Sequence, residues 1–303
     1  MEKEVKNILI AGGSGLIGKR IAALLESKSF NVYHLTRNPD LKGNYFFWDP
    51  EKKQIDKNAI ENADVIVNLA GTSLANQRWT AMRKRQIVNS RMFSTNFLFE
   101  SLQSIPNHVK LVINASAIGI YGNSGVLFMN ENSPVANDFL GKTCQRWEQA
   151  SHQFEKINIR TVIFRMGQVL SEEGGMLPEL IKSLRYGIMP VFASGNQYQS
   201  WIHIDDVCKM ISKAIVDDSI SGVYNAVAPG PLSNRNFMLL LTQILDKKYF
   251  EIRIPAIFMK LMLGEMSIVV INGTRASCKK IEAAGFVFKY PQADMALRNL
   301  LQI

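Results

Sequence analysis

Residues 8–18 read Ile-Leu-Ile-Ala-Gly-Gly-Ser-Gly-Leu-Ile-Gly, and this stretch decides the fold. The apolar run over 8–11 predicts a buried parallel strand, and a helical pattern begins a few residues later. Between them, Gly12, Gly15 and Gly18 have the spacing G-x-x-G-x-x-G. Glycines at this spacing serve a tight turn, a close approach of the backbone to a pyrophosphate, and close helix–strand packing. The stretch therefore predicts a dinucleotide-binding loop.

The same stretch predicts an anion site. The first N–H groups of the helix that follows have no partner within it, and the helix dipole favours a negative charge beside them. A purely structural glycine turn is the alternative, but a triplet between a strand and an amphipathic helix favours the cofactor. The predicted cofactor-binding residues of this stretch are Gly12, Ser14, Gly15, Leu16, Ile17 and Gly18.

The second predicted strand, residues 31–36, indicates which dinucleotide binds. A site that prefers NAD carries Asp or Glu near the end of this strand, where the carboxylate accepts from the ribose 2′-hydroxyl. This chain has Thr36 and Arg37 instead. A guanidinium matches a 2′-phosphate in charge and in geometry, so NADP(H) is favoured over NAD(H). A solvated loop arginine is the alternative.

The rest of the chain alternates apolar strands with helical segments, which is typical of a parallel sheet with crossover helices. Strands are expected near residues 7–11, 31–36, 45–49, 64–71, 110–116 and 160–166. Long helices are expected over 78–104 and 138–156. The predicted fold class is α/β, a Rossmann doubly wound parallel sheet with a smaller mixed C-terminal substrate lobe.

Two domains are expected, although no low-complexity linker separates them. Residues 1–228 would form the NADP(H)-binding Rossmann domain, with parts of 168–205 contributing to the substrate lobe, and 229–303 would form the C-terminal lobe. Ligands of open parallel sheets lie outside the carboxyl ends of the strands. This rule adds further residues to the predicted cofactor site, namely Asp49, Leu69, Ala70, Gly71 and Arg165.

The composition of the 303 residues excludes several classes of protein. A content of 47% hydrophobic and 20% charged residues is ordinary for a soluble enzyme. No apolar run approaches the roughly 20 residues of a transmembrane helix. The first predicted strand begins too early to leave room for a signal peptide. We therefore expect a cytoplasmic protein without a membrane partner.

Cysteine spacing and charge exclude two further classes. Cys144, Cys208 and Cys278 lie far apart without metal-type spacing, so neither a metal site nor a disulfide framework is expected. The net charge of +9 is compatible with nucleic-acid binding, but the basic residues are scattered and lack interleaved aromatic residues. A basic surface that attracts an anionic cofactor explains the charge, and no nucleic-acid partner is expected.

Several further motifs lie along nearly the whole chain. They are Val67-Asn-Leu-Ala-Gly71, Ser90-Arg91 with Thr95, Ala115-Ser-Ala-Ile-Gly-Ile-Tyr-Gly122, Phe139-Leu140 with Trp147-Glu148, Ser200-Trp-Ile-His-Ile-Asp-Asp206, Tyr224-Asn-Ala-Val-Ala-Pro229 and Ala284-Gly-Phe-Val-Phe288. With the glycine loop, they make the chain resemble the extended short-chain dehydrogenase/reductases, and more closely their atypical subgroup of epimerase-family proteins with a C-terminal domain of unknown function. The resemblance implies a Rossmann fold, NADP(H) binding and often a homodimer through the two long helices.

The chain also departs from that family. Catalysis there uses Ser or Thr, Tyr and Lys; the Lys lowers the pKa of the Tyr, which exchanges a proton with the substrate as hydride moves. At the family spacing, the Tyr and Lys positions hold Leu140 and Cys144, and the Ser position holds Ala117. Lys142 lies two residues out of register, about 200° around a helix. The usual proton relay is therefore not expected.

Other polar residues are candidates for the site. Tyr121 and Ser116 are the catalytic candidates, with core packing as the alternative for Tyr121. Arg91 is expected to hold a cofactor phosphate or a substrate anion, or else to form an ion pair on the helix surface. The predicted substrate-pocket residues are Glu131, Trp147, Trp201 and His203. A solvated loop carboxylate is the alternative for the first of these, and core packing is the alternative for the two tryptophans.

Three functions fit these observations. The first is an NADP(H)-dependent oxidoreductase that transfers hydride to a small carbonyl substrate without the Ser-Tyr-Lys triad. The second is a non-catalytic NADPH-binding sensor or partner protein. The third is a nucleotide-sugar epimerase, which ranks last because transient oxidation needs the missing base. The identity of the small-molecule substrate does not follow from the sequence.

Overall fold

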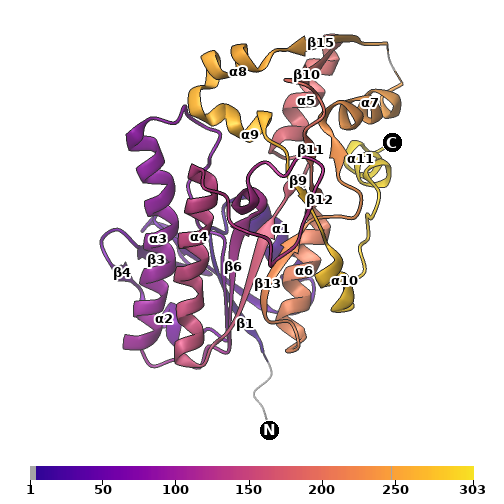
Figure 1. The fold of residues 1–303 in the computed structure, drawn as a ribbon. Helices are drawn as coiled ribbons and strands as arrows, with labels where there is room; N and C mark the ends of the chain where they lie inside the picture. Colours follow the sequence, from indigo (N-terminus) through magenta and orange to yellow (C-terminus); the bar gives the residue numbers. More distant parts are fainter. Residues whose placement is uncertain (1–4, 247) are drawn as a thin grey trace.

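The central element of the computed structural model, which describes residues 5–246 and 248–303, is an eight-stranded sheet (Figure 1). Its strand order is β13-β8-β6-β5-β1-β2-β3-β4. The strands are β1 (Asn7–Ala11), β2 (Asn31–Thr36), β3 (Tyr45–Asp49), β4 (Gln54–Ile55), β5 (Val65–Asn68), β6 (Leu111–Ala117), β8 (Arg160–Met166) and β13 (Gly222–Ala226). All neighbouring pairs are parallel except β3 and β4. From β1 the strand order runs outward in one direction through β2 and β3, and from β5 it runs outward in the other direction through β6 and β8. This reversal between β1 and β5 confirms the predicted doubly wound sheet.

Two hydrophobic cores lie on opposite faces of this sheet. Ile8 and Ile10 of β1 belong to one core, whereas Leu9 and Ala11 belong to the other, because successive strand side chains point to opposite faces. Helices α1 (Leu16–Glu26), α6 (Ile204–Val216) and α10 (Lys279–Ala283) supply residues to the first core. Helices α2 (Lys57–Glu61) and α3 (Ala81–Ser104) supply residues to the second. Burial on both faces explains why these strands are continuous apolar runs.

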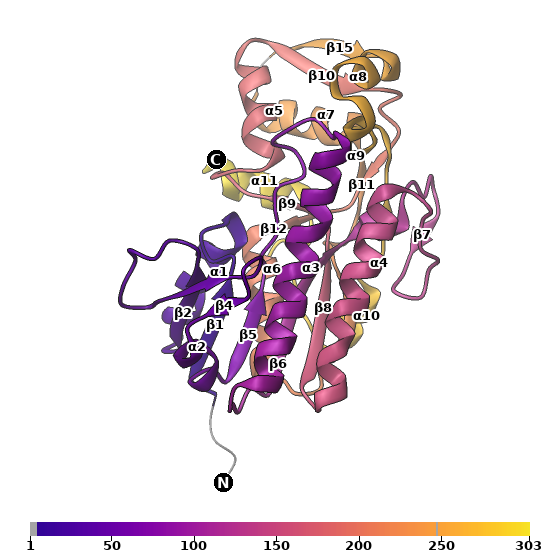
Figure 2. The ribbon, with the colours of Figure 1, turned by 90° about the vertical axis from the view of Figure 1, so that its left-hand side faces the viewer.

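The two long helices lie side by side (Figure 2). The first, α3, begins after Thr80, whose side chain accepts from the N–H of Arg83. The second, α4 (Phe139–Ser151), begins after Asp138, whose carboxylate accepts from the N–H of Gly141. The predicted helix over 138–156 ends earlier, because the chain continues as the 3₁₀ segment η2 (His152–Ile157). Both starts follow ordinary capping chemistry.

The C-terminal lobe has its own hydrophobic core, to which two separate segments of the chain contribute. The first segment carries α5 (Met176–Arg185) and β10 (Ile188–Phe192), and the second carries α7 (Asn234–Ile244), β15 (Phe250–Ile254) and α11 (Ala293–Leu301). Strands β10 and β15 pair in parallel. Between β15 and β16 (Arg275–Ala276) lie α8 (Ala256–Leu263), η3 (Gly264–Ser267) and α9 (Ile268–Ile271).

Short strand pairs and one buried carboxylate join the lobe to the sheet domain. The pairs are β9 (Gln168–Leu170) with β12 (Trp201–His203), β11 (Tyr198–Gln199) with β14 (Leu232–Ser233), and β7 (Phe128–Met129) with β16. Asp206, fully buried on α6, accepts from the backbone N–H groups of Lys289 at 2.8 Å and Tyr290 at 2.9 Å. Among the described residues, no helix is long and apolar enough to cross a membrane.

Candidate functional site

A cleft of about 640 Å³ lies at the carboxyl ends of β1, β2, β3 and β5. This is the edge at which a parallel sheet of this topology binds its ligand. Many of the predicted cofactor residues line it, namely Gly12, Ser14, Gly15, Thr36, Arg37, Asp49, Leu69, Ala70 and Gly71. The structure therefore brings together residues that lie up to about sixty positions apart in the sequence.

The glycine loop forms the floor of this cleft. Gly12 has a φ of +82°, and a Cβ atom there would lie 2.8 Å from the carbonyl carbon of Leu69. A Cβ atom at Gly18 would lie 2.3 Å from the carbonyl oxygen of Gly12, so this glycine lets α1 approach the loop. Leu16 and Ile17 are half-buried and pack against the core. Leu16, Ile17 and Gly18, which were predicted to bind the cofactor, therefore support the loop by packing.

The N-terminus of α1 is open for an anion. Gly15 precedes the helix, forms no side-chain cap, and no acidic residue lies in the first turn. The orphan N–H groups and the positive end of the helix dipole both favour an anionic group at this point. The loop thus fits a pyrophosphate by geometry and by electrostatics.

The end of β2 carries cationic and polar side chains toward the same cleft. Arg37 is exposed, and no hydrogen bond or ion pair joins its guanidinium to another residue within the described ranges. The hydroxyl of Thr36 accepts from the N–H of Asn38 at 3.1 Å. Asp49, at the end of β3, accepts from the N–H groups of Glu51 and Lys52. The guanidinium of Arg37 and the hydroxyl hydrogen of Thr36 therefore remain available to donate to a ligand.

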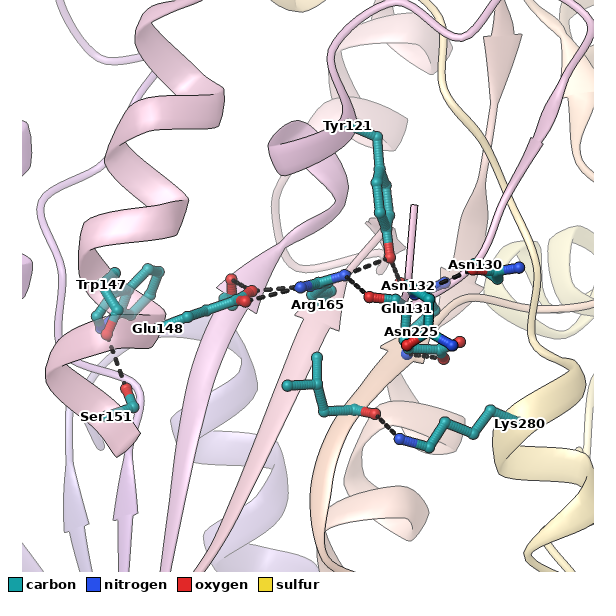
Figure 3. A network of polar contacts seen from close by, with 12 residues as sticks. Tyr121, Asn130, Glu131, Asn132, Trp147, Glu148, Ser151, Arg165, Asn225 and Lys280 are labelled. Carbon is teal, nitrogen blue, oxygen red and sulfur yellow. Dashed lines mark hydrogen bonds and ion pairs between the residues drawn. The ribbon is translucent and has the colours of Figure 1, made fainter. Parts of the chain in front are cut away.

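A second polar cluster lies further along the same sheet edge, and its polar groups are hydrogen-bonded to one another (Figure 3). At its centre Arg165 forms a bidentate ion pair with Glu148, with both N–O distances 2.8 Å. The remaining Nη1 donates to the hydroxyl of Tyr121 at 2.7 Å and to the carbonyl oxygen of Glu131 at 2.9 Å. We call Ser116, Tyr121, Glu131, Glu148, Arg165 and Asn225 the arginine network.

Known proteins share this combination of sequence and fold. A model described as the NAD dependent epimerase/dehydratase family matches residues 8–226, and a domain of unknown function matches 254–300. The chain belongs to the NAD dependent epimerase/dehydratase family. An epimerase family protein of Staphylococcus aureus (strain MRSA252) is 36% identical over 304 residues, covering 98% of this chain and 99% of the relative. The epimerase family protein YfhF of Bacillus subtilis is 33% identical over 300 residues, covering 97% and 98%.

Solved structures agree with this assignment. The human epimerase family protein SDR39U1, crystallised with NADPH, has a TM-score of 0.89 and 26% identity, and the match covers 98% of this chain and 99% of that one. A nucleoside-diphosphate sugar epimerase of Corynebacterium glutamicum has a TM-score of 0.80 and 31% identity, over 98% of this chain and 58% of that one. The expected resemblance to atypical extended short-chain dehydrogenase/reductases is confirmed, and with it a fold that binds a nicotinamide dinucleotide.

This epimerase-family chain has no proton relay at the positions that the family resemblance assigned to Tyr and Lys in the sequence analysis. Cys144, in the Lys position, is buried, and burial raises the pKa of its thiol to about 12. Leu140, in the Tyr position, packs beside Gly119. Lys142 is exposed to solvent, in agreement with its predicted offset around the helix. The residues at these positions therefore offer no acid or base near neutral pH.

The two predicted catalytic residues both belong to the arginine network. The hydroxyl of Ser116 donates to Glu148 at 2.6 Å, and the hydroxyl of Tyr121 donates to Asn225 at 2.7 Å. Both side chains are buried, and burial raises the pKa of Tyr121. A neutral phenol whose hydrogen is already donated is poorly placed to exchange protons with a substrate. Their catalytic roles remain predictions.

Two of the three predicted cofactor arginines, Arg91 and Arg165, lie outside the cleft. Arg165 is held in the arginine network, with hydrogen bonds from both its Nη atoms and its Nε to protein groups. Arg91 donates to the carbonyl oxygens of Thr72 and Ile87, and its guanidinium lies 5.1 Å from the ring centroid of Trp147. The alternative interpretation of Arg91, an ion pair on the helix surface, is not observed among the described residues, because the side chain lies against Trp147 of α4.

The predicted substrate-pocket residues are largely structural. Trp201 is fully buried in the core of the lobe and donates to the carbonyl oxygen of Gly230 at 3.2 Å. Trp147 is also buried and donates to the hydroxyl of Thr95 at 3.2 Å. Each ring fills space between packed elements, and neither lines the cleft at the ends of β1 and β2. The carboxylate of Glu131 accepts from the N–H of Asn225 at 2.8 Å, so it is not a solvated loop acid.

His203 caps α6. Its Nδ1 accepts from the N–H of Asp205 at 3.0 Å, and its ring lies 3.9 Å from that of Tyr290. Burial lowers the pKa of this imidazole to about 4. It borders a small hollow of about 250 Å³ beside Arg20 and Asn299, away from the cofactor cleft. Its predicted place in a substrate pocket is therefore not supported.

Sequence reasoning missed His34, which lines the cofactor cleft. Its ring stacks on Tyr45, and its Nδ1 occupies the space that a side chain at Gly13 would need. His34 lies two residues before Thr36, so the two-residue period of a strand places both on the same face. That period could have identified it. Glu148 and Asn225 were also missed as partners, although both lie within motifs quoted above.

Proposed function

We propose that this epimerase-family protein binds NADP(H) in the cleft at the ends of β1 and β2. The observation that carries the proposal is the unpaired Arg37 guanidinium, which stands beside Thr36 where an NAD site would carry a carboxylate. A 2′-phosphate would supply the bidentate acceptor that this side chain lacks. The human relative crystallised with NADPH supports the same cofactor.

We further propose that the protein is an oxidoreductase acting on a small carbonyl substrate. When bound, NADPH would supply a hydride. The chain's own contribution would be to bind the dinucleotide in the cleft and to hold it beside the substrate, which accelerates transfer without a covalent step. Since Tyr121 and Ser116 donate their hydrogens within the arginine network, the proton for the product oxygen comes from water.

A specific observation favours a second candidate, an NADPH-binding sensor. The relay positions hold Leu140 and the inert thiol of Cys144, while the glycine loop is intact. A nucleotide-sugar epimerase ranks third, because the base that transient oxidation requires is absent from these positions. The name of the Corynebacterium glutamicum relative keeps this third function open.

A fluorescence titration with NADPH and NADH in parallel tests the cofactor. Clear preference for NADPH supports the proposal, and equal affinity for both contradicts it. A panel of carbonyl compounds then separates the functions. NADPH oxidation identifies an oxidoreductase, tight binding without turnover identifies a sensor, and isomer exchange of a nucleotide sugar without net cofactor use identifies an epimerase.

A further inference from the structure

The C-terminal lobe exposes several large apolar side chains on neighbouring segments of the chain. Residues 250–263 read Phe-Glu-Ile-Arg-Ile-Pro-Ala-Ile-Phe-Met-Lys-Leu-Met-Leu and form β15 and α8. Six large apolar side chains in this segment are 38% to 73% exposed. We call them the apolar strip, which consists of Phe250, Ile252, Ile257, Phe258, Leu261 and Met262.

The periods of the two elements explain why these side chains face outward. On α8, Met259 is buried and Ala256 and Leu263 are half-buried, so the 3.6-residue period turns the four apolar residues of the strip to the opposite face. On β15, Phe250 and Ile252 share one face of a strand whose partner β10 adds the exposed Ile188 beside Phe250. Figure 1 shows β10, β15 and α8 together at one end of the molecule.

Exposed basic residues lie on the same elements and on α5, which packs against β10. Within 182–188 and 248–262, the exposed charged residues are Lys182, Arg185, Lys248, Arg253 and Lys260. The acidic Glu251 is the exception in these ranges, and it is ion-paired with Arg235 and Arg253. A large apolar surface with a charged rim marks an interaction site. The sign of the rim selects a partner that carries negative charge.

We propose that the apolar strip docks the protein on the surface of an anionic lipid bilayer. Apolar side chains at the headgroup boundary and basic side chains beside anionic lipids are the two contributions that hold peripheral proteins on membranes. A second copy of this chain would present the same basic rim in a protein of net charge +9, and like charges oppose that pairing. The eight residues of α8 are too few to span a bilayer, so the contact is peripheral. This proposal departs from the sequence-based expectation of no membrane partner, which rested on the lack of an apolar run long enough to span a bilayer.

Flotation of the full chain with vesicles tests this proposal. Wild-type protein is expected to float with vesicles of phosphatidylcholine and phosphatidylglycerol, and at least about tenfold less with phosphatidylcholine alone. The double variant Phe258→Ser/Leu261→Ser is expected to lose at least about tenfold of the binding, since both apolar anchors go. Lys260→Glu is expected to lose several-fold on anionic vesicles only. Val287→Ser, at an exposed apolar residue outside the strip, is the matched control and should bind like wild type.

Three results would overturn the proposal. They are failure of wild-type protein to float with anionic vesicles, flotation that the double variant leaves unchanged, and a dimer in vesicle-free sedimentation that the double variant abolishes. The last would assign the strip to a second copy. NADPH titration of each variant verifies that the sheet domain is intact, because no strip residue lines the cofactor cleft. If the double variant does not fold, the single variants Lys260→Glu and Met262→Ser test the basic and the apolar contribution separately in the same flotation experiment.

Discussion

The cofactor cleft and the arginine network lie on the same edge of one sheet, yet their polar groups differ in what they bind. In the cleft, the guanidinium of Arg37 and the first N–H groups of α1 have no partner among the described residues. In the network, Arg165 has a protein partner on each of its three nitrogens. Since unpaired donors gain most from a ligand, the difference separates groups that bind a ligand from groups that hold the fold.

Removing the central cation of the network should have the largest effect on stability. Arg165→Met leaves the buried carboxylate of Glu148 without its ion pair, and we expect a loss of about 3–5 kcal/mol in the free energy of unfolding. Urea denaturation measures it. Arg165→Met/Glu148→Leu should regain most of that loss, because no buried charge remains. A loss below about 1 kcal/mol in the single variant would show that the network is not structural.

Acid should reveal whether His203 is part of the fold or part of a site. Burial lowers the pKa of His203 from 6.5 to about 4, so its contribution is complete above pH 6.5 and is lost as the pH falls toward 4. The expected loss is on the order of 3 kcal/mol. His203→Asn keeps a side-chain acceptor for the N–H of Asp205 and cannot titrate. Denaturation curves between pH 7 and pH 4 should therefore fall more steeply in wild type than in the variant; parallel curves would contradict the buried neutral imidazole.

Removing the cation of the cleft should change binding rather than stability. Arg37→Ala is expected to weaken NADPH binding by about 2 kcal/mol and to leave NADH binding unchanged, because only NADPH carries the 2′-phosphate. Fluorescence titration measures both constants. The matched control is Arg85→Ala, an exposed arginine of α3 outside the cleft. Equal losses for both cofactors would refute the 2′-phosphate contact.

Removing the hydroxyl of Tyr121 should have the smallest effect, and it separates a structural role from a catalytic one. Tyr121→Phe leaves one acceptor on Asn225 and one donor on Arg165 short of a partner, and should cost about 1 kcal/mol in stability. NADPH affinity and any turnover should be unaffected, since the proposed proton source is water. A large loss of turnover at unchanged stability would return Tyr121 to the catalytic role that the sequence suggested.

The sequence predicts the sheet and the cofactor cleft well, for local reasons. Strands such as β5 are apolar throughout because both faces are covered, and the glycine loop is required by close contacts within a few residues. Arg37 and Thr36 follow from their position at the end of β2. These features depend on short stretches whose physical demands can be read without knowing the remainder of the chain.

The arginine network could not be predicted, because its partners meet only in the folded chain. Tyr121 and Asn225 lie 104 positions apart, and Arg165 and Glu148 are brought together by a strand and a helix that the sequence does not orient. The same limit explains why Trp147 and Trp201 were predicted to line a substrate pocket although both are buried. The sequence alone does not distinguish an aromatic residue that lines a pocket from one that fills a core.

The buried carboxylate of Asp206 has a consequence for how this gene can change. Its two N–H partners, at Lys289 and Tyr290, belong to the segment that matches a separate family description. A chain ended after Ala228 would keep the acid on α6 and lose both donors, leaving a buried charge unsolvated. The segments 8–226 and 254–300 are therefore expected to be inherited together. Recombination that exchanged one of them alone would lower stability even if the cofactor cleft were unchanged.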